Sequence, residues 1–229
     1  MALEYIIFYR KKKNKAGWKK SSESSTISIM VINWYGEACF KIQSGDLVLL
    51  SDPFDSSTGL TAPRFRADVV INTGLKQPVA YTAKGKEDEA IAVHGPGEYE
   101  VKGIEIKGWS NKDTAVFTVV MEEMKLCFLG HLTSSLEPAV LEQLAETDIL
   151  FVPAGGKPYL DQEEIAKIIK KISPKLAVAS LFKIPGLKRK ADDVKDFLKA
   201  ADQKSEAQEK LTIKKKDLAT GTKVVILKI

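Results

Sequence analysis

The pattern of hydrophobic and polar positions changes once along the chain. From residue 30 to residue 129, apolar residues form short alternating or continuous runs bounded by Gly, Pro, Ser and Asp. This pattern is typical of β-strands joined by tight turns. After Gly130, short apolar runs alternate with segments in which apolar residues recur every three or four positions. The second half is therefore predicted to alternate strands with amphipathic helices.

The predicted elements are short, and their order indicates an α/β protein with two packed sheets and helices outside. Strands are expected at residues 31–35, 39–43, 47–50, 69–71, 79–81, 90–93, 99–101, 104–106, 114–121, 126–129, 149–152, 176–179, 211–214 and 224–227. Helices are expected at 138–146, from Asp161 onward, and at 192–201. We expect the two C-terminal strands, at 211–214 and 224–227, to join the sheet of the second half.

The strand at 69–71 should be central and buried. Its run of Val69, Val70 and Ile71 is β-branched throughout, as in strands covered on both faces. In α/β proteins the carboxyl ends of such strands commonly carry the chemistry. Here the loop at 73–78 contains no histidine, carboxylate or cysteine.

Charge is distributed unevenly. Seven of the 35 basic residues and two of the 30 acidic residues lie in 1–29, which leaves 28 of each in 30–229. We therefore divide the chain into a basic, Ser-rich, disordered leader at 1–29 and one domain at 30–229. Two interpretations of the leader stay open. It is either an arm for nucleic acid or anionic membrane, or, as we favour, a disordered leader, with Met30 as a candidate for the true start.

The composition also bounds the cellular setting. No apolar run approaches the roughly 18 residues of a membrane span. Cys39 and Cys127 both lie in strand-like apolar patterns, which favours buried free thiols in a reducing compartment over a disulfide. A cytoplasmic location is predicted.

Several segments, in this order, resemble the metallo-β-lactamase-fold proteins, in particular the branch of proposed Zn-dependent hydrolases that begins with a Trp-x-Gly-x-x-x-Phe strand. The segments are Trp34–Phe40, Asp52–Phe54, Ala67–Val70, Gly95–Val101, Leu129–Gly130, Val152–Gly156 and Lys183–Leu187. The resemblance runs from Met30 to the end of the chain. It implies an α/β, metallo-β-lactamase-like four-layer αββα sandwich of two mixed sheets.

The resemblance also implies a zinc site, but this sequence departs from the family pattern at its ligand positions. The His-x-His-x-Asp-His motif falls on Gly74, Lys76, Pro78 and Val79. A later histidine is missing near 109–111, the next aspartate is His131, and the last histidine is Leu181. Catalytic zinc usually needs three protein ligands, so we expect no metal and no cofactor here.

The same resemblance predicts that four positions converge in an emptied pocket: Gly74, Lys76, His131 and Leu181. Because Lys76 and His131 can both carry positive charge, they favour a small anionic molecule as the ligand, with a protein partner as the alternative. Candidate catalytic residues are His131, Asp52 and Glu37, and each also has a structural interpretation. His94, before a Gly-Pro-Gly turn, is expected to be structural.

Three functions follow from these residues. The favoured one is a catalytically inactive pseudoenzyme that works as a binding or scaffold protein. The second is a residual or metal-independent hydrolase that uses Glu37, Asp52 and His131. The third is a nucleic-acid-associated protein that acts through the leader, although the neutral body argues against it.

Overall fold

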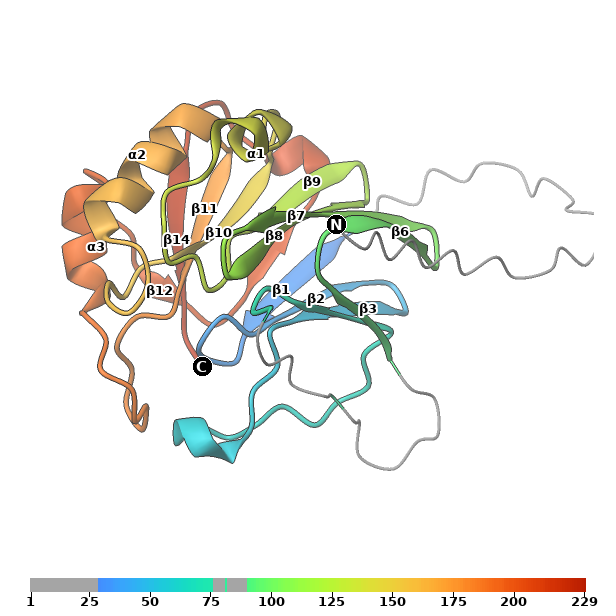
Figure 1. Ribbon diagram of the computed structural model, residues 1–229, viewed down its shortest axis with the longest axis horizontal. Helices are drawn as coiled ribbons and strands as arrows, with labels where there is room; N and C mark the ends of the chain where they lie inside the picture. The colour runs from blue at the N-terminus through green and yellow to red at the C-terminus, as the bar shows by residue number, and fades with distance from the viewer. Residues whose placement is uncertain (1–28, 76–80, 82–89) are drawn as a thin grey trace, which may run out of the picture.

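Two β-sheets pack face to face, with helices on the outer side of the larger one (Figure 1). The computed structural model describes residues 29–75, 81 and 90–229. Both sheets contain parallel and antiparallel pairs. The prediction of an α/β sandwich of two mixed sheets is therefore confirmed. Nearly all of the predicted leader lies outside the described residues.

The smaller sheet has six strands, and five of them come from the part of the chain before residue 95. Its order is β13 (Leu211–Ile213), β1 (Met30–Trp34), β2 (Phe40–Ser44), β3 (Leu47–Ser51), β4 (Val69–Asn72) and β5 (Ile91–His94). Its outer face is covered in part by the segment 53–67, which includes the 3-10 helix η1 (Ser56–Thr58) and carries Phe54 and Leu60 against the sheet.

The larger sheet has eight strands. Its order is β12 (Ala207–Gln208), β14 (Lys223–Leu227), β11 (Leu176–Ser180), β10 (Ile149–Pro153), β9 (Met124–Phe128), β8 (Thr114–Met121), β7 (Ile104–Asn111) and β6 (Gly97–Val101). The helices are α1 (Pro138–Gln143), α2 (Gln162–Ile172) and α3 (Val194–Ala200), with the 3-10 helix η2 at Lys215–Asp217. None of the described helices is long and apolar enough to cross a membrane.

Strand β4 is buried along its whole length, between β3 and β5 and parallel to both. Val69 and Ile71 belong to the core between the sheets, whereas Val70 packs into the cluster under the loop with Phe54. Because both faces are covered, an unbroken β-branched run is the stable choice. The predicted buried strand is confirmed.

One prediction about topology is wrong. The strand β13 pairs antiparallel with β1 in the smaller sheet, and only β14 joins the sheet of the second half. Without β13, β1 would leave a row of unpaired backbone groups at the sheet edge. The alternation of Leu211, Thr212 and Ile213 from half-buried to exposed to buried suits this edge position.

Smaller differences concern element ends. The strand expected at 104–106 continues to Asn111 as β7, and the helix expected to reach 146 ends at Gln143. The expected strand at 79–81 lies outside the described residues except for Tyr81, which is not in a strand. By contrast, α2 follows its sequence signals, because Asp161 caps it by accepting the amide of Glu163 at 2.9 Å.

The core between the sheets is aromatic at its centre. Phe151 lies with its ring centroid 4.6 Å from that of Phe40 and 4.4 Å from that of Phe128, so the stack spans both sheets. Cys39 and Cys127 are both buried and free, as predicted. The cytoplasmic location inferred from them stays a prediction.

Candidate functional site

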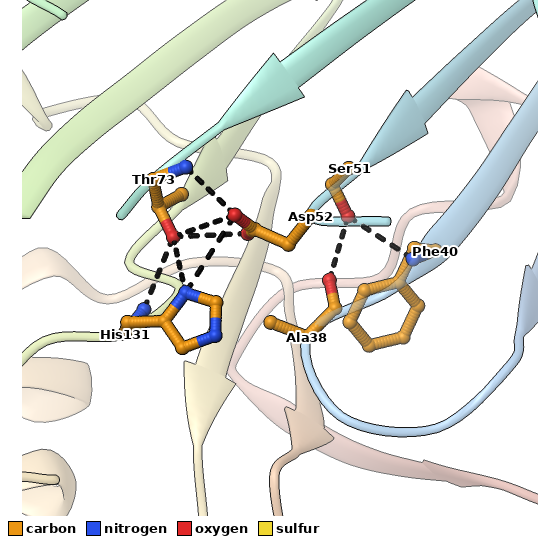
Figure 2. A network of polar contacts seen from close by, with 6 residues as sticks. All are labelled: Ala38, Phe40, Ser51, Asp52, Thr73 and His131. Atoms are coloured by element: carbon orange, nitrogen blue, oxygen red, sulfur yellow. Dashed lines mark hydrogen bonds and ion pairs between the residues drawn. The ribbon is translucent and has the colours of Figure 1, made fainter. Parts of the chain in front are cut away.

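Three polar side chains meet where strands of the two sheets end (Figure 2). Asp52 follows β3, Thr73 follows β4, and His131 follows β9. Both Asp52 and Thr73 are buried, whereas 29% of the His131 side chain is exposed. Residues 79 positions apart in the sequence therefore share one network that touches the surface through the imidazole.

The centre of this network is the Thr73 hydroxyl. Its oxygen lies 3.0 and 2.9 Å from the two carboxylate oxygens of Asp52, 2.9 Å from His131 Nδ1, and 3.2 Å from the His131 backbone nitrogen. The Thr73 amide also donates to Asp52 Oδ1 at 2.7 Å. Asp52 thereby receives two donors from one residue.

These contacts fix the tautomer of His131 through a count of protons. A hydroxyl has one hydrogen to donate and two lone pairs to accept with. Asp52, as a carboxylate, only accepts, so it takes the hydroxyl hydrogen of Thr73. The other two contacts of that oxygen are then donations from the His131 amide and from Nδ1–H. Nδ1 of His131 therefore carries the proton, and in the neutral ring Nε2 is left with a free lone pair.

Backbone geometry brings Thr73 into this position. After β4 the chain crosses toward the larger sheet, where the Ala115 amide donates to the Thr73 carbonyl at 2.8 Å and Gly74 bridges Thr114. Gly130 allows the close approach, because a Cβ there would lie 2.0 Å from the Thr73 hydroxyl oxygen. Its φ of 46° also favours glycine.

Burial raises the pKa of the Asp52 carboxyl above its ordinary value. The neighbouring His131 and the two hydrogen bonds from Thr73 act in the opposite direction but do not fully offset the loss of hydration. Asp52 is thus a carboxylate held in a poorly hydrated place by donors that favour its charged form.

A second set of contacts continues from His131. The ring of Tyr159, from the loop between β10 and α2, lies 5.5 Å from the imidazole, and Arg189 Cζ lies 5.1 Å from the Tyr159 ring centroid. Arg189 Nη2 is 3.2 Å from Glu37 Oε2 and donates to the Leu181 carbonyl at 2.7 Å. The Leu181 amide in turn donates to the Glu37 carbonyl at 3.1 Å.

Charges around Tyr159 report the same proximity. Burial raises the pKa of Tyr159 to about 12, Arg189 lowers it in part, and the carboxylates of Glu37 and Asp52 raise it. Tyr159 is thus neutral at physiological pH and lies within electrostatic reach of both carboxylates.

Strained backbone gathers at this edge. Glu37, Asp52 and Leu181 are buried and have φ values of 48°, 39° and 61°, in the left-handed region that non-glycine residues rarely adopt. Such strain persists only where surrounding contacts hold it, and it is often associated with function. The described positive-φ residues outside this site include turn positions such as Glu122 and Glu123 between β8 and β9.

The sequence-based candidates lie as follows. Glu37, Asp52, His131 and Leu181 belong to one connected set of contacts. Gly74 directly follows Thr73, and Lys76 lies outside the described residues. The convergence of Gly74, Lys76, His131 and Leu181 in one ligand-binding pocket thus stays a prediction. His94 ends β5 with an exposed side chain, and the Tyr99 hydroxyl lies 3.4 Å from its backbone oxygen.

Sequence reasoning missed three members of the set: Thr73, Tyr159 and Arg189. Thr73 lies in the loop that follows the predicted strand at 69–71, but threonine is neither a usual metal ligand nor a usual base. The other two lie in loops without a recognisable motif, and only the fold brings them to the site. The one available signal was position, because all three follow buried strands of the sheets.

The residues present do not fit the zinc site that the resemblance implies. Among the described ligand positions, Gly74 has no side chain, Leu181 is hydrocarbon, and His131 has one ring nitrogen engaged with Thr73. Within the described part of the chain, no group of three or more His, Cys, Asp or Glu side chains could hold a metal ion.

Comparison with solved structures supports the fold. A proposed Zn-dependent hydrolase of the metallo-β-lactamase superfamily from Thermotoga maritima is 29% identical, with a TM-score of 0.73 over 87% of this chain and 100% of that chain. A proposed metal-dependent hydrolase from Parabacteroides distasonis is 12% identical, with a TM-score of 0.58 over 88% of this chain and 94% of that chain. The latter likeness shows the fold alone.

A further solved structure and a family model agree with this fold. The structure is that of a metallo-β-lactamase fold protein from Bacillus subtilis, which is 11% identical, with a TM-score of 0.57 over 88% of this chain and 96% of that chain. No curated protein matches the chain significantly. The model of the β-lactamase superfamily domain matches residues 31–180, which is more than half of the chain. The chain therefore belongs to the β-lactamase superfamily, and its fold is that of the metallo-β-lactamases.

Proposed function

We propose that this protein is a metal-free member of its superfamily that works as a binding or scaffold protein. The observation that supports this most is the state of two expected ligand positions. Leu181 is a fully buried hydrocarbon side chain, and Nδ1 of His131 is hydrogen-bonded to the Thr73 hydroxyl. The sequence adds Lys76, Pro78 and Val79 at three further positions, outside the described residues. A zinc ion would have too few donors there.

The chemistry of the remaining groups favours a small anionic ligand. His131 is partly exposed, and within the described residues no hydrogen bond engages its Nε2, which can bind a ligand as an acceptor when neutral and as a donor when protonated. Lys76 would add a positive charge if its side chain reaches the same edge, which the resemblance predicts. A partner protein that covers this edge is the alternative if no small anion binds.

Elemental analysis of the purified full chain tests the absence of a metal. We expect less than stoichiometric zinc, and a stoichiometric content would overturn the proposal. Thermal shift assays with Zn²⁺, Mn²⁺ and a panel of phosphates and carboxylates then test the ligand. We expect anions to raise the melting temperature, and this effect should disappear in Lys76→Ala. Stabilisation by metals that disappears in His131→Ala would also contradict the proposal.

A second candidate function is metal-independent hydrolysis, which the Asp52–Thr73–His131 contacts favour. Asp52 accepts from Thr73, Thr73 accepts from Nδ1–H of His131, and Nε2 is left as a base with a free lone pair. Such a base could take a proton from water as the water attacks an ester, and then return it to the leaving group. Nothing in the contacts supplies a side-chain nucleophile, because Thr73 is fully buried.

The two functions separate in an assay with excess EDTA. For hydrolysis, chromogenic carboxylic and phosphodiester substrates should be cleaved by the wild type and about 100-fold more slowly by His131→Asn. Asparagine places its amide near the position of Nδ1 but lacks Nε2, so it is the matched control for structure. Equal rates in both proteins would exclude His131 as the base, and absence of turnover on all substrates would favour the binding protein.

A further inference from the structure

The contacts of Arg189 bear on how the loop at Leu181 is held in place without a metal ligand. In the metallo-β-lactamase-fold proteins that the chain resembles, the loop after β11 supplies the last metal ligand, at the position of Leu181. A metal at such a place holds several loops together. Here that loop still adopts a strained conformation, with φ of 61° at Leu181, so something other than a ligand bond must hold it.

The Arg189 guanidinium makes the contacts that such a role needs. It donates to the Leu181 carbonyl at 2.7 Å through Nη2, and to Glu37 Oε2 at 3.3 and 3.2 Å through Nε and Nη2. It also lies over the ring of Tyr159 at 5.1 Å. Only 20% of its side chain is exposed. One cation therefore touches residues that follow β1, β10 and β11.

Local packing brings these three loops close together. A Cβ at Gly155 would lie 2.0 Å from the Leu181 carbonyl oxygen, so the loop after β10 passes directly beneath it. The Asp192 amide donates to the Gly155 carbonyl at 2.8 Å, which ties the segment carrying Arg189 to the same loop. The guanidinium thus sits at the junction of backbone segments that approach to contact distance.

The Glu37 carboxylate is the second part of the argument. Its side chain is 9% exposed, and Oε1 is the one buried side-chain N or O atom in the described residues without a hydrogen-bond partner. Burying a carboxylate with an unpartnered oxygen costs free energy, and another interaction of the same carboxylate has to offset that cost. The bond from Arg189 to Oε2 is such an interaction.

We infer that Arg189 is a fixed cation that joins the loops after β1, β10 and β11, in place of a metal. Guanidinium suits this role, because it is planar, keeps its charge at any physiological pH and offers five donors. Unlike a metal, it is present as soon as the chain folds. The inference does not depend on whether the protein binds an anion or hydrolyses an ester.

Hydrogen exchange in Arg189→Met tests this role. Methionine keeps much of the apolar length of the side chain but removes every donor. We expect amide protection to fall about tenfold or more, together, at Leu181, Tyr159 and Asp192, because the loops lose a shared anchor. Protection in β8 should not change. If protection falls near Asp192, in the segment that carries Arg189, but not at Leu181 and Tyr159, the inference is overturned.

Thermal unfolding gives a second readout and a matched control. Arg189→Met should lower the melting temperature by roughly 10 °C, because it leaves the buried Glu37 carboxylate without its cation. Lys167→Met, which breaks an exposed ion pair with Glu164, should change it by less than about 2 °C. If Arg189→Met melts as the control does, the inference is wrong.

A double-mutant cycle protects the test against simple misfolding. The cycle combines Arg189→Met with Glu37→Gln, which removes the opposite charge with little change in shape. We expect the melting temperature of the double variant Glu37→Gln with Arg189→Met to fall little further than that of Arg189→Met alone. Additive shifts would show that the two residues act independently and would overturn the inference.

Discussion

One hydroxyl decides the chemistry available at the candidate site. Thr73 has a single hydrogen, and Asp52 takes it, so the imidazole of His131 must donate through Nδ1. A residue that is neither acid nor base thereby sets which nitrogen of its neighbour can accept a proton. This role was invisible in the sequence, since a threonine after a strand has many structural uses.

Replacing Asp52 should reverse the tautomer of His131. In Asp52→Asn, the side-chain oxygen can still accept from the Thr73 amide, but the new NH₂ donates to the Thr73 hydroxyl. With a donor there, the hydroxyl hydrogen turns to Nδ1, and the proton of the neutral ring moves to Nε2. Imidazole ¹⁵N chemical shifts above the titration range of histidine measure this directly.

The chain offers its own reference for that experiment, because it contains only two histidines. His94 has an exposed side chain, and its ¹⁵N shifts should be the same in both proteins. A spectrum in which Asp52→Asn leaves Nδ1 of His131 protonated would contradict the count of hydrogen bonds around Thr73.

Asp68 should make stability depend on acid pH. Although burial raises the pKa of Asp68, hydrogen bonds from the Lys102 ammonium and the Val48 amide bring it below its ordinary value of 3.8. A lowered folded-state pKa gives stability that is full above 3.8 and is lost as the pH falls through the folded-state value. Lys102 lies in the turn between β6 and β7, so this ion pair links the two sheets.

The corresponding variant is Asp68→Asn. Near pH 7 we expect it to lower the free energy of unfolding by roughly 1 kcal/mol, a modest figure because Lys102 is half exposed and screened by solvent. The difference from wild type should shrink once the pH drops below the lowered pKa of Asp68. Urea unfolding at pH 7 and at a series of decreasing acidic pH values follows this difference, and a difference that stays constant across the whole series would exclude Asp68 as the titrating group.

At the scale of elements, hydrophobic period predicted most strands and helices but not their partners. The run at 69–71 and the capped segment from Asp161 carry local signals strong enough to define β4 and α2. By contrast, β13 offers only three residues, and its choice of sheet depends on the open edge of β1, far away in sequence. Pairing partners for short strands are set by tertiary packing, which local periodicity does not record.

The aromatic stack between the sheets should carry a large share of stability. Phe151 is buried and contacts Phe40 from one sheet and Phe128 from the other. Phe151→Ala should therefore lower the free energy of unfolding by about 3–5 kcal/mol, measured by urea denaturation. The control is Val120→Ala, also in a strand but 42% exposed, for which we expect less than about 1 kcal/mol. Similar losses in both would indicate that the stack collapses without a cavity.

For the whole molecule, the candidate site is an edge at which both sheets contribute loops. The sequence pointed to Asp52, His131 and Leu181 through the order of family-like segments, and the structure connects them. It did not point to Tyr159 or Arg189, because their roles arise from contacts between loops that no motif encodes. Resemblance can carry forward the positions where a family keeps its ligands. The contacts made at such a position in this chain depend on packing, which local sequence does not record.

The predicted leader at 1–29 should add little to the stability of the domain at 30–229. Residues 1–28 lie outside the described residues, so this prediction depends on composition: a basic cluster and a Ser-rich run are too polar to build a core. The described core closes without them, since β13 covers the edge of β1 and the buried apolar residues begin at Met30. A chain that begins at Met30 should therefore unfold cooperatively and melt within about 4 °C of the full chain, a shift of about 1 kcal/mol for a protein of this size. Calorimetry of both chains in the same buffer measures this, and loss of a cooperative transition on truncation would show that the leader packs against the domain.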